Sequence, residues 1–223
     1  MSAAQCDILV VDDQAPVRQM MRLMLTQFGM GEVGLAHDGV EAVAMLAEAV
    51  PRALIADINM PNMNGLELLK RVRCGDTGAP RDLPVLMLTG HGESVVVSTA
   101  IALDVDGFVL KPAGPSNMKP RLERVLAGPR TALKDVAIYR AVAVPDVSSA
   151  GARFPVESLT VPPGMRVVPL EVSAVDKVLA VPVTAKDGWP LYPAGVAVTM
   201  DMLVRLSDLA EIGLVHPGLV VRA

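Results

Sequence analysis

The sequence predicts an α/β protein with an open parallel sheet in its first half, followed by a smaller β-rich domain. Three observations support this prediction. Short apolar runs alternate with helix-length segments up to about Gly128, which is the pattern of repeated βα units. Beyond Gly128, frequent prolines break up short Val-rich runs, which favours short strands and turns. Polar residues capable of chemistry stand at the ends of four of the early runs: Asp12-Asp13, Asp57, Thr89 and Lys111.

The first half is expected to contain five strands, each followed by a helix. Uninterrupted runs of Val, Leu, Ile and Met are typical of strands buried on both faces. Pro16 suits the first turn of the first helix, and Gly29 suits its end. Expected strands cover residues 8–11, 33–36, 53–57, 83–88 and 107–110; expected helices cover 17–28, 40–50, 65–73, 93–103 and a fifth that ends near 127.

The fifth helix has a less regular sequence than the others. Pro115 suits a helix start, but Pro120 has no N–H and would break an interior turn. We therefore expect this helix to begin only near residues 117–119. Five βα units with short connections predict a three-layer sandwich with right-handed crossovers.

The second half is expected to form short strands and a single helix. Asp187-Gly188 is a hairpin-type turn between runs at 178–184 and 191–192. Thr199 suits the N-cap of a helix over 200–212, and a closing strand is expected at 219–221. These patterns divide the chain into a first domain at 1–128, a linker containing a first strand at 129–156, and a small β-rich output or interaction domain at 157–223.

Composition narrows the classes of function. Of 223 residues, just over half are apolar, and the net charge is −4. Residues 1–128 have fifteen acidic and eleven basic side chains, and the remainder has nine of each, so neither part has the basic excess of a duplex-DNA binder. Cys6 and Cys74 are the only cysteines, which argues against a disulfide framework or a structural zinc site. No stretch approaches the ~20 apolar residues of a membrane span, and the start lacks a basic leader region, so a cytoplasmic protein is expected.

The four strand ends are expected to meet, because side chains at the carboxyl ends of parallel strands share one crevice. Asp12, Asp13 and Asp57 would repel one another there without a cation, and oxygen-only ligands select a hard ion such as Mg²⁺. A carboxylate beside that ion can attack an activated phosphoryl donor. Lys111 can supply positive charge and Thr89 a hydroxyl donor to the phosphoryl oxygens. Gly90, directly after Thr89, leaves room for that group.

These residues closely resemble the receiver domain of two-component response regulators. The resemblance covers about residues 5–127, and its motifs occur in order with the expected separations. They are Val10-Val11-Asp12-Asp13, Asp57-Ile58-Asn59-Met60-Pro61-Asn62-Met63-Asn64-Gly65, Leu88-Thr89-Gly90 and Phe108-Val109-Leu110-Lys111-Pro112.

The resemblance implies a flavodoxin-like, doubly wound sheet with strand order 2-1-3-4-5. It also implies that a histidine kinase or a phosphotransfer protein phosphorylates Asp57. Asp12 and Asp13 would hold Mg²⁺ together with Asp57 and the backbone carbonyl of Asn59. Lys111 and Thr89 would contact the phosphoryl group.

Other roles come from the resemblance alone. Thr89 and Phe108 would form a switch pair, in which the hydroxyl moves to the phosphoryl group and the ring rotates inward. Asn59 and His91 fall where the family varies the lifetime of the phosphoryl group, and the Lys111–Pro112 peptide is often cis there. Taken alone, Phe108 is typical of core packing and His91 of an exposed loop.

Two positions depart from the family pattern. Ala113 stands where a bulkier apolar residue is usual, and Pro120 is unusual in the last helix. Both lie on a face that such domains commonly use for dimerisation or output. The departures leave the mode of partner contact open and the phosphorylation chemistry intact.

The second half resembles a small β-domain that often precedes HD-type cyclic-dinucleotide phosphodiesterases, over about residues 157–215. The catalytic part is expected to be absent, because the chain has only three histidines and its second half has no His-Asp pair. Apart from slow autodephosphorylation, no enzymatic activity is expected. The favoured function is a phosphorylation-controlled protein that binds another protein or forms a homodimer; the alternatives are a DNA-binding transcriptional regulator and a scaffold that is never phosphorylated.

Overall fold

The structure is a computed structural model that describes residues 6–90, 94–128, 133–145, 161–186, 188–211 and 213–222. In its first part, strands and helices alternate along the chain as expected. The strands are β1 (Ile8–Val11), β2 (Val33–Ala36), β3 (Ala53–Asp57), β4 (Val85–Thr89) and β5 (Gly107–Leu110). The helices are α1 (Ala15–Gln27), α2 (Gly39–Glu48), α3 (Gly65–Cys74), α4 (Ser94–Ala102) and α5 (Pro115–Ala127).

The five strands form one parallel sheet in the order β2-β1-β3-β4-β5. This is the flavodoxin-like, doubly wound arrangement, so the predicted strand order is confirmed. The register pairs Val11 with Ala56 and Thr89 with Leu110. The carboxyl ends of β1, β3, β4 and β5 therefore lie along one edge of the sheet.

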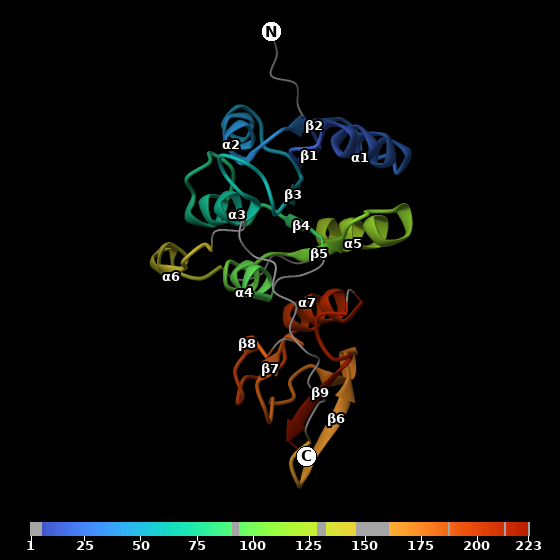
Figure 1. The fold of residues 1–223 in the computed structure, drawn as a ribbon, viewed down its shortest axis with the longest axis vertical. Helices are drawn as coiled ribbons and strands as arrows, with labels where there is room; N and C mark the ends of the chain where they lie inside the picture. Colours follow the sequence, from blue (N-terminus) through green and yellow to red (C-terminus); the bar gives the residue numbers. More distant parts are fainter. Residues whose placement is uncertain are drawn as a thin grey trace. The chain divides into compact units, whose positions relative to one another are not determined.

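Helices cover both faces of this sheet: α1 and α5 lie on one side, and α2 and α3 on the other (Figure 1). The face under α1 and α5 carries a continuous apolar core. Each fully buried Leu, Ile or Met in such a core contributes roughly 1.5–3 kcal/mol, and α1 contributes Met21, Met24 and Leu25 to it. The core includes Ile8, Val10, Met21, Met24, Leu25, Ile55, Leu86, Leu88, Val109, Met118 and Leu122.

The fifth helix begins earlier than the sequence predicts. Pro115 opens α5, and Asn117 Oδ1 accepts the Gly114 N–H at 2.8 Å. Pro120 lies inside the helix, in its second turn. Its missing N–H removes one hydrogen bond, but the buried side chains of Met118 and Leu122 anchor the helix to the sheet on either side of it. Tertiary packing thus outweighs the local effect of this proline.

Residues 133–145 fold back against the first part of the chain. They contain a helix, α6 (Val136–Ala141), which packs on α3. A linker with a first strand is expected over 129–156, whereas the described part of this segment contains a helix. Asp135 starts the helix, because its side chain accepts the Ala137 N–H at 2.8 Å.

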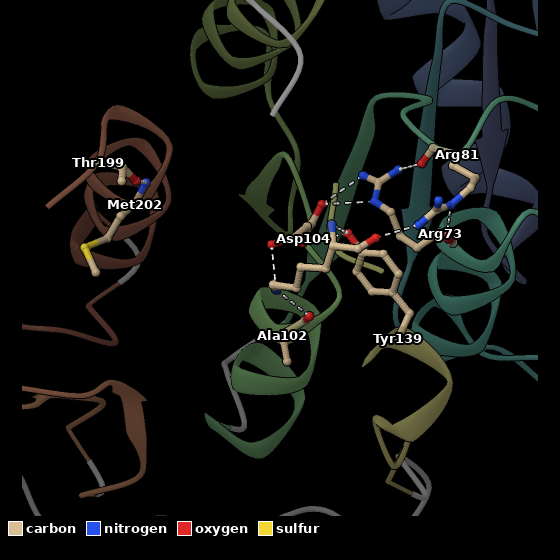
Figure 2. A network of polar contacts seen from close by, with 8 residues as sticks. Arg73, Arg81, Ala102, Asp104, Tyr139, Thr199 and Met202 are labelled. Carbon is tan, nitrogen blue, oxygen red and sulfur yellow. Dashed lines mark hydrogen bonds and ion pairs between the residues drawn. The ribbon is translucent and has the colours of Figure 1, made fainter. Parts of the chain in front are cut away.

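A buried polar network fixes α6 in place (Figure 2). The Tyr139 side chain is fully buried, and its hydroxyl donates to Asp104 Oδ2 at 2.8 Å. Lys134 Nζ lies 2.9 Å from Asp104 Oδ1. Arg73 Nη2 donates to the Asp104 carbonyl at 2.8 Å, and Lys70 Nζ donates to the Val142 carbonyl at 2.7 Å. We refer to residues 133–145 as the strap.

The C-terminal part contains small antiparallel sheets and one described helix, as expected. Strand β6 (Met165–Pro169) pairs with β9 (Gly218–Arg222), and β7 (Val183–Thr184) pairs with β8 (Pro190–Tyr192). A 3₁₀ turn, η1, covers Val172–Ala174. Helix α7 (Met200–Glu211) follows Thr199, whose Oγ1 accepts the Met202 N–H at 3.2 Å. Asp187 of the expected hairpin turn lies outside the described residues.

The chain separates into two units, residues 1–91 with 102–149 and residues 92–101 with 150–223. The candidate site and the strap both belong to the first unit. Among the described residues, no helix combines the length and apolar character needed to cross a membrane.

Candidate functional site

The carboxyl edge of the sheet brings together the residues that the sequence singled out. Asp12 directly follows β1, Asp57 ends β3, Thr89 ends β4 and Lys111 directly follows β5. The Lys111 N–H donates to the Thr89 carbonyl at 2.7 Å, which joins the last two positions. Four sequence-distant segments therefore contribute side chains to one site.

Three carboxylates form an acidic cluster in this site. Asp12, Asp13 and Asp57 each present one oxygen within 4.8 Å of the others. Asp12 and Asp57 are buried, whereas Asp13 is exposed. The cluster therefore opens to solvent on the Asp13 side.

One ammonium group faces the two buried carboxylates. Lys111 Nζ lies 2.8 Å from Asp12 Oδ2 and 2.8 Å from Asp57 Oδ2. Charge-assisted contacts of this length are among the strong polar contacts in proteins. Three carboxylates against one ammonium leave the site with an excess of negative charge.

The electrostatics follow from burial and from this charge excess. Burial raises the pKa of Asp57, and the nearby Asp12 carboxylate adds to the rise, while the hydrogen bond and charge of Lys111 oppose it. For Lys111, burial acts to lower the pKa, but hydrogen bonds to Asp12 and Asp57 and their charges raise it overall. Lys111 is therefore held as an ammonium ion, and a further cation would favour the ionised form of Asp57.

The loop after β1 is held by two further contacts. The Gln14 N–H donates to Asp12 Oδ1 at 2.9 Å, and Arg18 Nη1 donates to the Asp12 carbonyl at 2.6 Å. Arg18 was not singled out in the sequence analysis. Its position one turn into the first helix, near Asp12, is the signal that points to it.

The expected switch pair lies on neighbouring strands. The Thr89 hydroxyl is buried and donates to the Gly90 carbonyl at 3.2 Å. The Phe108 side chain is fully buried, and Phe108 pairs with Met87 in the β4–β5 register. A Cβ added at Gly90 would meet no atom of the described residues within 4 Å.

The turn after β3 brings α3 against Asp57. A Cβ added at Gly65 would lie 2.2 Å from the Asp57 carbonyl oxygen, so only glycine allows this approach. Asn59 lies exposed in the turn, and the Lys111–Pro112 peptide is cis. His91 lies outside the described residues.

Asp38 is a further acidic residue near the site, outside the cluster of Asp12, Asp13 and Asp57, and it was not predicted from the sequence. It caps α2, and its side chain also contacts Asn62 in the turn after β3, at 2.7 Å. The Glu41 N–H lowers the pKa of Asp38, against the opposing effect of burial. Asp38 before a helix predicts the cap, but its contact 24 residues away has no local signal.

Comparison with known proteins places this site in a family. The response regulator receiver domain matches residues 8–123, more than half of the chain. The chain belongs to the response regulator receiver family. The chemotaxis protein CheY1 of Helicobacter pylori is 39% identical to the receiver over 120 residues, which are 53% of this chain and 95% of that protein. The chemotaxis protein CheY homolog of Campylobacter jejuni is 40% identical over 120 residues, 53% of this chain and 91% of that protein.

A solved structure of a response regulator from Chloroflexus aurantiacus is also similar to the receiver. It is 32% identical with a TM-score of 0.51, over 56% of this chain and 99% of that chain. The receiver family takes part in two-component signalling, and the acidic pocket is consistent with Mg²⁺ and phosphorylation.

The residues present fit a magnesium ion. The donors are carboxylate oxygens, the ligands that Mg²⁺ prefers, and the described cluster contains no imidazole or thiolate. Exposure of Asp13 leaves the cluster open to water, and Mg²⁺ usually keeps several bound waters. Burial raises the pKa of Asp57 and so disfavours its ionised form. A cation bound beside Asp57 would stabilise that form.

Proposed function

We propose that this protein is a phosphorylation-controlled switch in which Asp57 accepts a phosphoryl group. The observation that supports this most directly is the sharing of Lys111 Nζ between Asp12 and Asp57, at 2.8 Å from each. That arrangement places a positive charge beside a buried carboxylate at the carboxyl edge of the sheet. The chemistry belongs to the phosphoryl-transfer class, which depends mainly on positioning and charge neutralisation.

Each site residue has a distinct role in this proposal. Asp12, Asp13, Asp57 and the Asn59 carbonyl would hold Mg²⁺, which neutralises charge on the phosphoryl oxygens when bound. Lys111 would shift its contact from the carboxylates to a phosphoryl oxygen. Thr89 would turn its hydroxyl from the Gly90 carbonyl to another phosphoryl oxygen.

The donor would be a phosphohistidine of a histidine kinase or a phosphotransfer protein. The bond from phosphorus to the donor nitrogen breaks, and a bond from phosphorus to an Asp57 carboxylate oxygen forms. The donor imidazole leaves with the bonding electron pair. Phe108, packed beside β4, would respond to the movement of Thr89, and Asn59 and His91 would set how long the phosphoryl group persists.

The output is proposed to be non-enzymatic. We assign residues 1–128 to the receiver, 129–156 to the connection and 157–223 to an interaction domain. We also propose that residues 157–223 resemble the module that precedes HD-type phosphodiesterases without its catalytic part, since the chain has only three histidines. Phosphorylation would change binding to another protein or formation of a homodimer.

Labelling by a small phosphodonor with Mg²⁺ tests the phosphoacceptor assignment. Wild-type protein is expected to gain one phosphoryl group, detected by intact mass, and Asp57→Asn is expected to gain none. The control is Asp82→Asn, because Asp82 is exposed and lies before β4, at the opposite end of the sheet. Labelling that persists in Asp57→Asn would contradict the assignment.

A further inference from the structure

Residues at the start of α3 make hydrogen bonds that fix one side of the turn between β3 and α3, residues 58–64. The Gly65 N–H donates to the Ile58 carbonyl at 3.0 Å. Asn64 and Glu67 form a reciprocal capping box at the start of α3. Asn59 lies in this turn, two residues after Asp57. The path of the turn therefore sets where the Asn59 backbone lies relative to the acidic cluster.

The other side of the turn is held by the start of α2. Asp38 is 3% exposed, and its Oδ2 accepts the Asn62 side-chain N–H at 2.7 Å. The Gly39 N–H donates to the Met63 carbonyl at 3.1 Å. A Cβ added at Gly39 would lie 2.7 Å from Met63 Cγ and 2.8 Å from Met63 O. The two segments thus approach so closely that only glycine fits at this position.

The two carboxylate oxygens of Asp38 accept hydrogen bonds from different groups. Oδ1 accepts the Glu41 N–H at 2.9 Å, which caps α2. Oδ2 is the oxygen that contacts Asn62. An N-cap needs only the first of these oxygens, so the contact with Asn62 is additional to the requirement of the helix.

Asn62 needs such a contact because its backbone is in the left-handed region, at a φ of 63°. This region is disfavoured for residues with a side chain, although Asn tolerates it better than most. A hydrogen bond to an ionised carboxylate is stronger than one between neutral groups. The Asp38 contact therefore offsets the conformational cost and fixes the turn.

We propose that Asp38 is a positioning residue for the magnesium site and acts through Asn62 on the turn that carries Asn59. The inference rests on the proposed function, in which the Asn59 carbonyl is a metal ligand. Asp38 itself does not bind the ion. Its loss frees the turn and weakens metal binding even when α2 remains capped.

A magnesium titration of the full chain tests this, with backbone amide NMR shifts as the readout and no phosphodonor present. Asp38→Ser keeps an N-cap oxygen but cannot reach Asn62, and Asn62→Ala removes the contact without changing charge. Each is expected to raise the Kd for Mg²⁺ about tenfold, because loss of contacts behind metal ligands commonly costs that much or more. The double variant is expected to bind no more weakly than the weaker single variant, because both remove one contact.

Two control variants separate this role from general effects. Asp135→Ser alters another aspartate N-cap, that of α6, and is expected to leave the Kd unchanged. Glu41→Gln removes a nearby charge while keeping an acceptor for the His37 N–H, and is also expected to leave the Kd nearly unchanged. Should Asp38→Ser fail to fold, Asn62→Gly decides, since it removes the contact, leaves the cap of α2 intact and adopts a φ of 63° without strain.

The outcomes distinguish this inference from the proposed function. Asp13→Ala must weaken Mg²⁺ binding if the acidic cluster is the metal site; if it does not, both proposals fail. If Asp13→Ala weakens binding while Asn62→Ala does not, the metal site stands and the role of Asp38 is overturned. Fully additive effects of Asp38→Ser and Asn62→Ala would also overturn it.

Discussion

At the scale of single residues, Lys111 has two opposing effects on its site. Its ammonium group offsets the repulsion between Asp12 and Asp57, lying 2.8 Å from an oxygen of each. It also occupies the neighbourhood in which a divalent cation would bind the same two carboxylates. Lys111 therefore favours the folded site without metal and opposes Mg²⁺ electrostatically; in the proposed function it would contact a phosphoryl group.

Lys111→Met is expected to separate metal binding from phosphoryl transfer. Like charges a few ångströms apart repel by several kcal/mol at an effective dielectric constant of about 20. After relaxation, we expect Mg²⁺ to bind about tenfold more tightly to the variant, as measured by titration. Labelling of Asp57 by a phosphodonor is expected to slow about a hundredfold, because the variant lacks the positive charge that would stabilise the transferring phosphoryl group.

Lys119→Met serves as the control, because Lys119 is an exposed residue of α5. It is expected to change neither quantity. Weaker Mg²⁺ binding in Lys111→Met would show that Lys111 organises the carboxylates more than it repels the ion.

At the scale of secondary-structure elements, α5 shows how packing overrides a local signal. The sequence places its start near residues 117–119 because of Pro120, whereas the helix begins at Pro115. Pro115 needs no N–H at the first turn, but Pro120 lacks one that an interior turn would use. The helix forms through Pro120 because its apolar face is buried against the sheet.

Pro120→Ala is therefore expected to stabilise the protein. An interior proline costs about 3 kcal/mol in a helix, and part of this is offset by its restriction of the unfolded chain. We expect the free energy of unfolding in urea to rise by about 1 kcal/mol or more. Pro115→Ala should change it by less than about 0.5 kcal/mol, and a destabilised Pro120→Ala would contradict the account.

The strap is a second element whose structure depends on distant contacts. Its helix has six residues, too few to be stable alone. Tyr139 is buried between Lys134 and Asp104, and Arg81 lies over its ring at 5.7 Å (Figure 2). Docking on α3 and on the segment after α4 therefore stabilises the helix.

Tyr139→Phe tests this docking. It removes the hydrogen bond to Asp104 and the one from the Lys134 N–H. The free energy of unfolding is expected to fall by about 1–3 kcal/mol in urea titrations. Ile138→Ala, at an exposed position of the same helix, is expected to have little effect.

The effect of Tyr139→Phe on the free energy of unfolding is expected to depend on pH. Burial, and then the hydrogen bond to Asp104, raise the pKa of Tyr139 from 10.0 to about 12. Because the folded-state pKa is the higher one, the stabilisation is complete below pH 10.0 and is lost as the pH rises through about 12. The difference in unfolding free energy between wild type and Tyr139→Phe should be constant below pH 10.0 and shrink above it. A constant difference at all pH values would show that the hydroxyl is not buried in this way.

At the scale of the whole molecule, neither part of the chain has the basic excess of a duplex-DNA binder. Residues 1–128 have fifteen acidic and eleven basic side chains, and residues 129–223 have nine of each. A nucleic-acid binder that neutralises phosphates releases counterions and shows a steep dependence on salt.

We expect little binding of labelled duplex DNA in an anisotropy titration, and a salt dependence close to flat. Phosphorylated and unphosphorylated protein should behave alike. Tight binding with a steep salt slope would favour the alternative of a DNA-binding regulator over a protein-binding output.

Much of the receiver could be predicted because parallel sheets obey simple rules. Apolar runs locate the strands, and the position of Asp12, Asp57 and Lys111 at strand ends predicts a shared site. The single helix after Thr199 and the closing strand also have local signals, in an N-cap residue and an apolar run. The pairing of β6 with β9 joins residues more than forty positions apart and has no such signal.

The amino-acid order by itself determined which chemical groups reach the carboxyl edge of the sheet, because strand period and crossover handedness leave few alternatives. Tertiary structure alone decided the contact between Asp38 and Asn62, the course of α5 through Pro120, and the docking of the strap through Tyr139. These features depend on side chains that meet only after the chain has packed. Their energies come from burial and from hydrogen bonds between segments, which no local pattern of residues encodes.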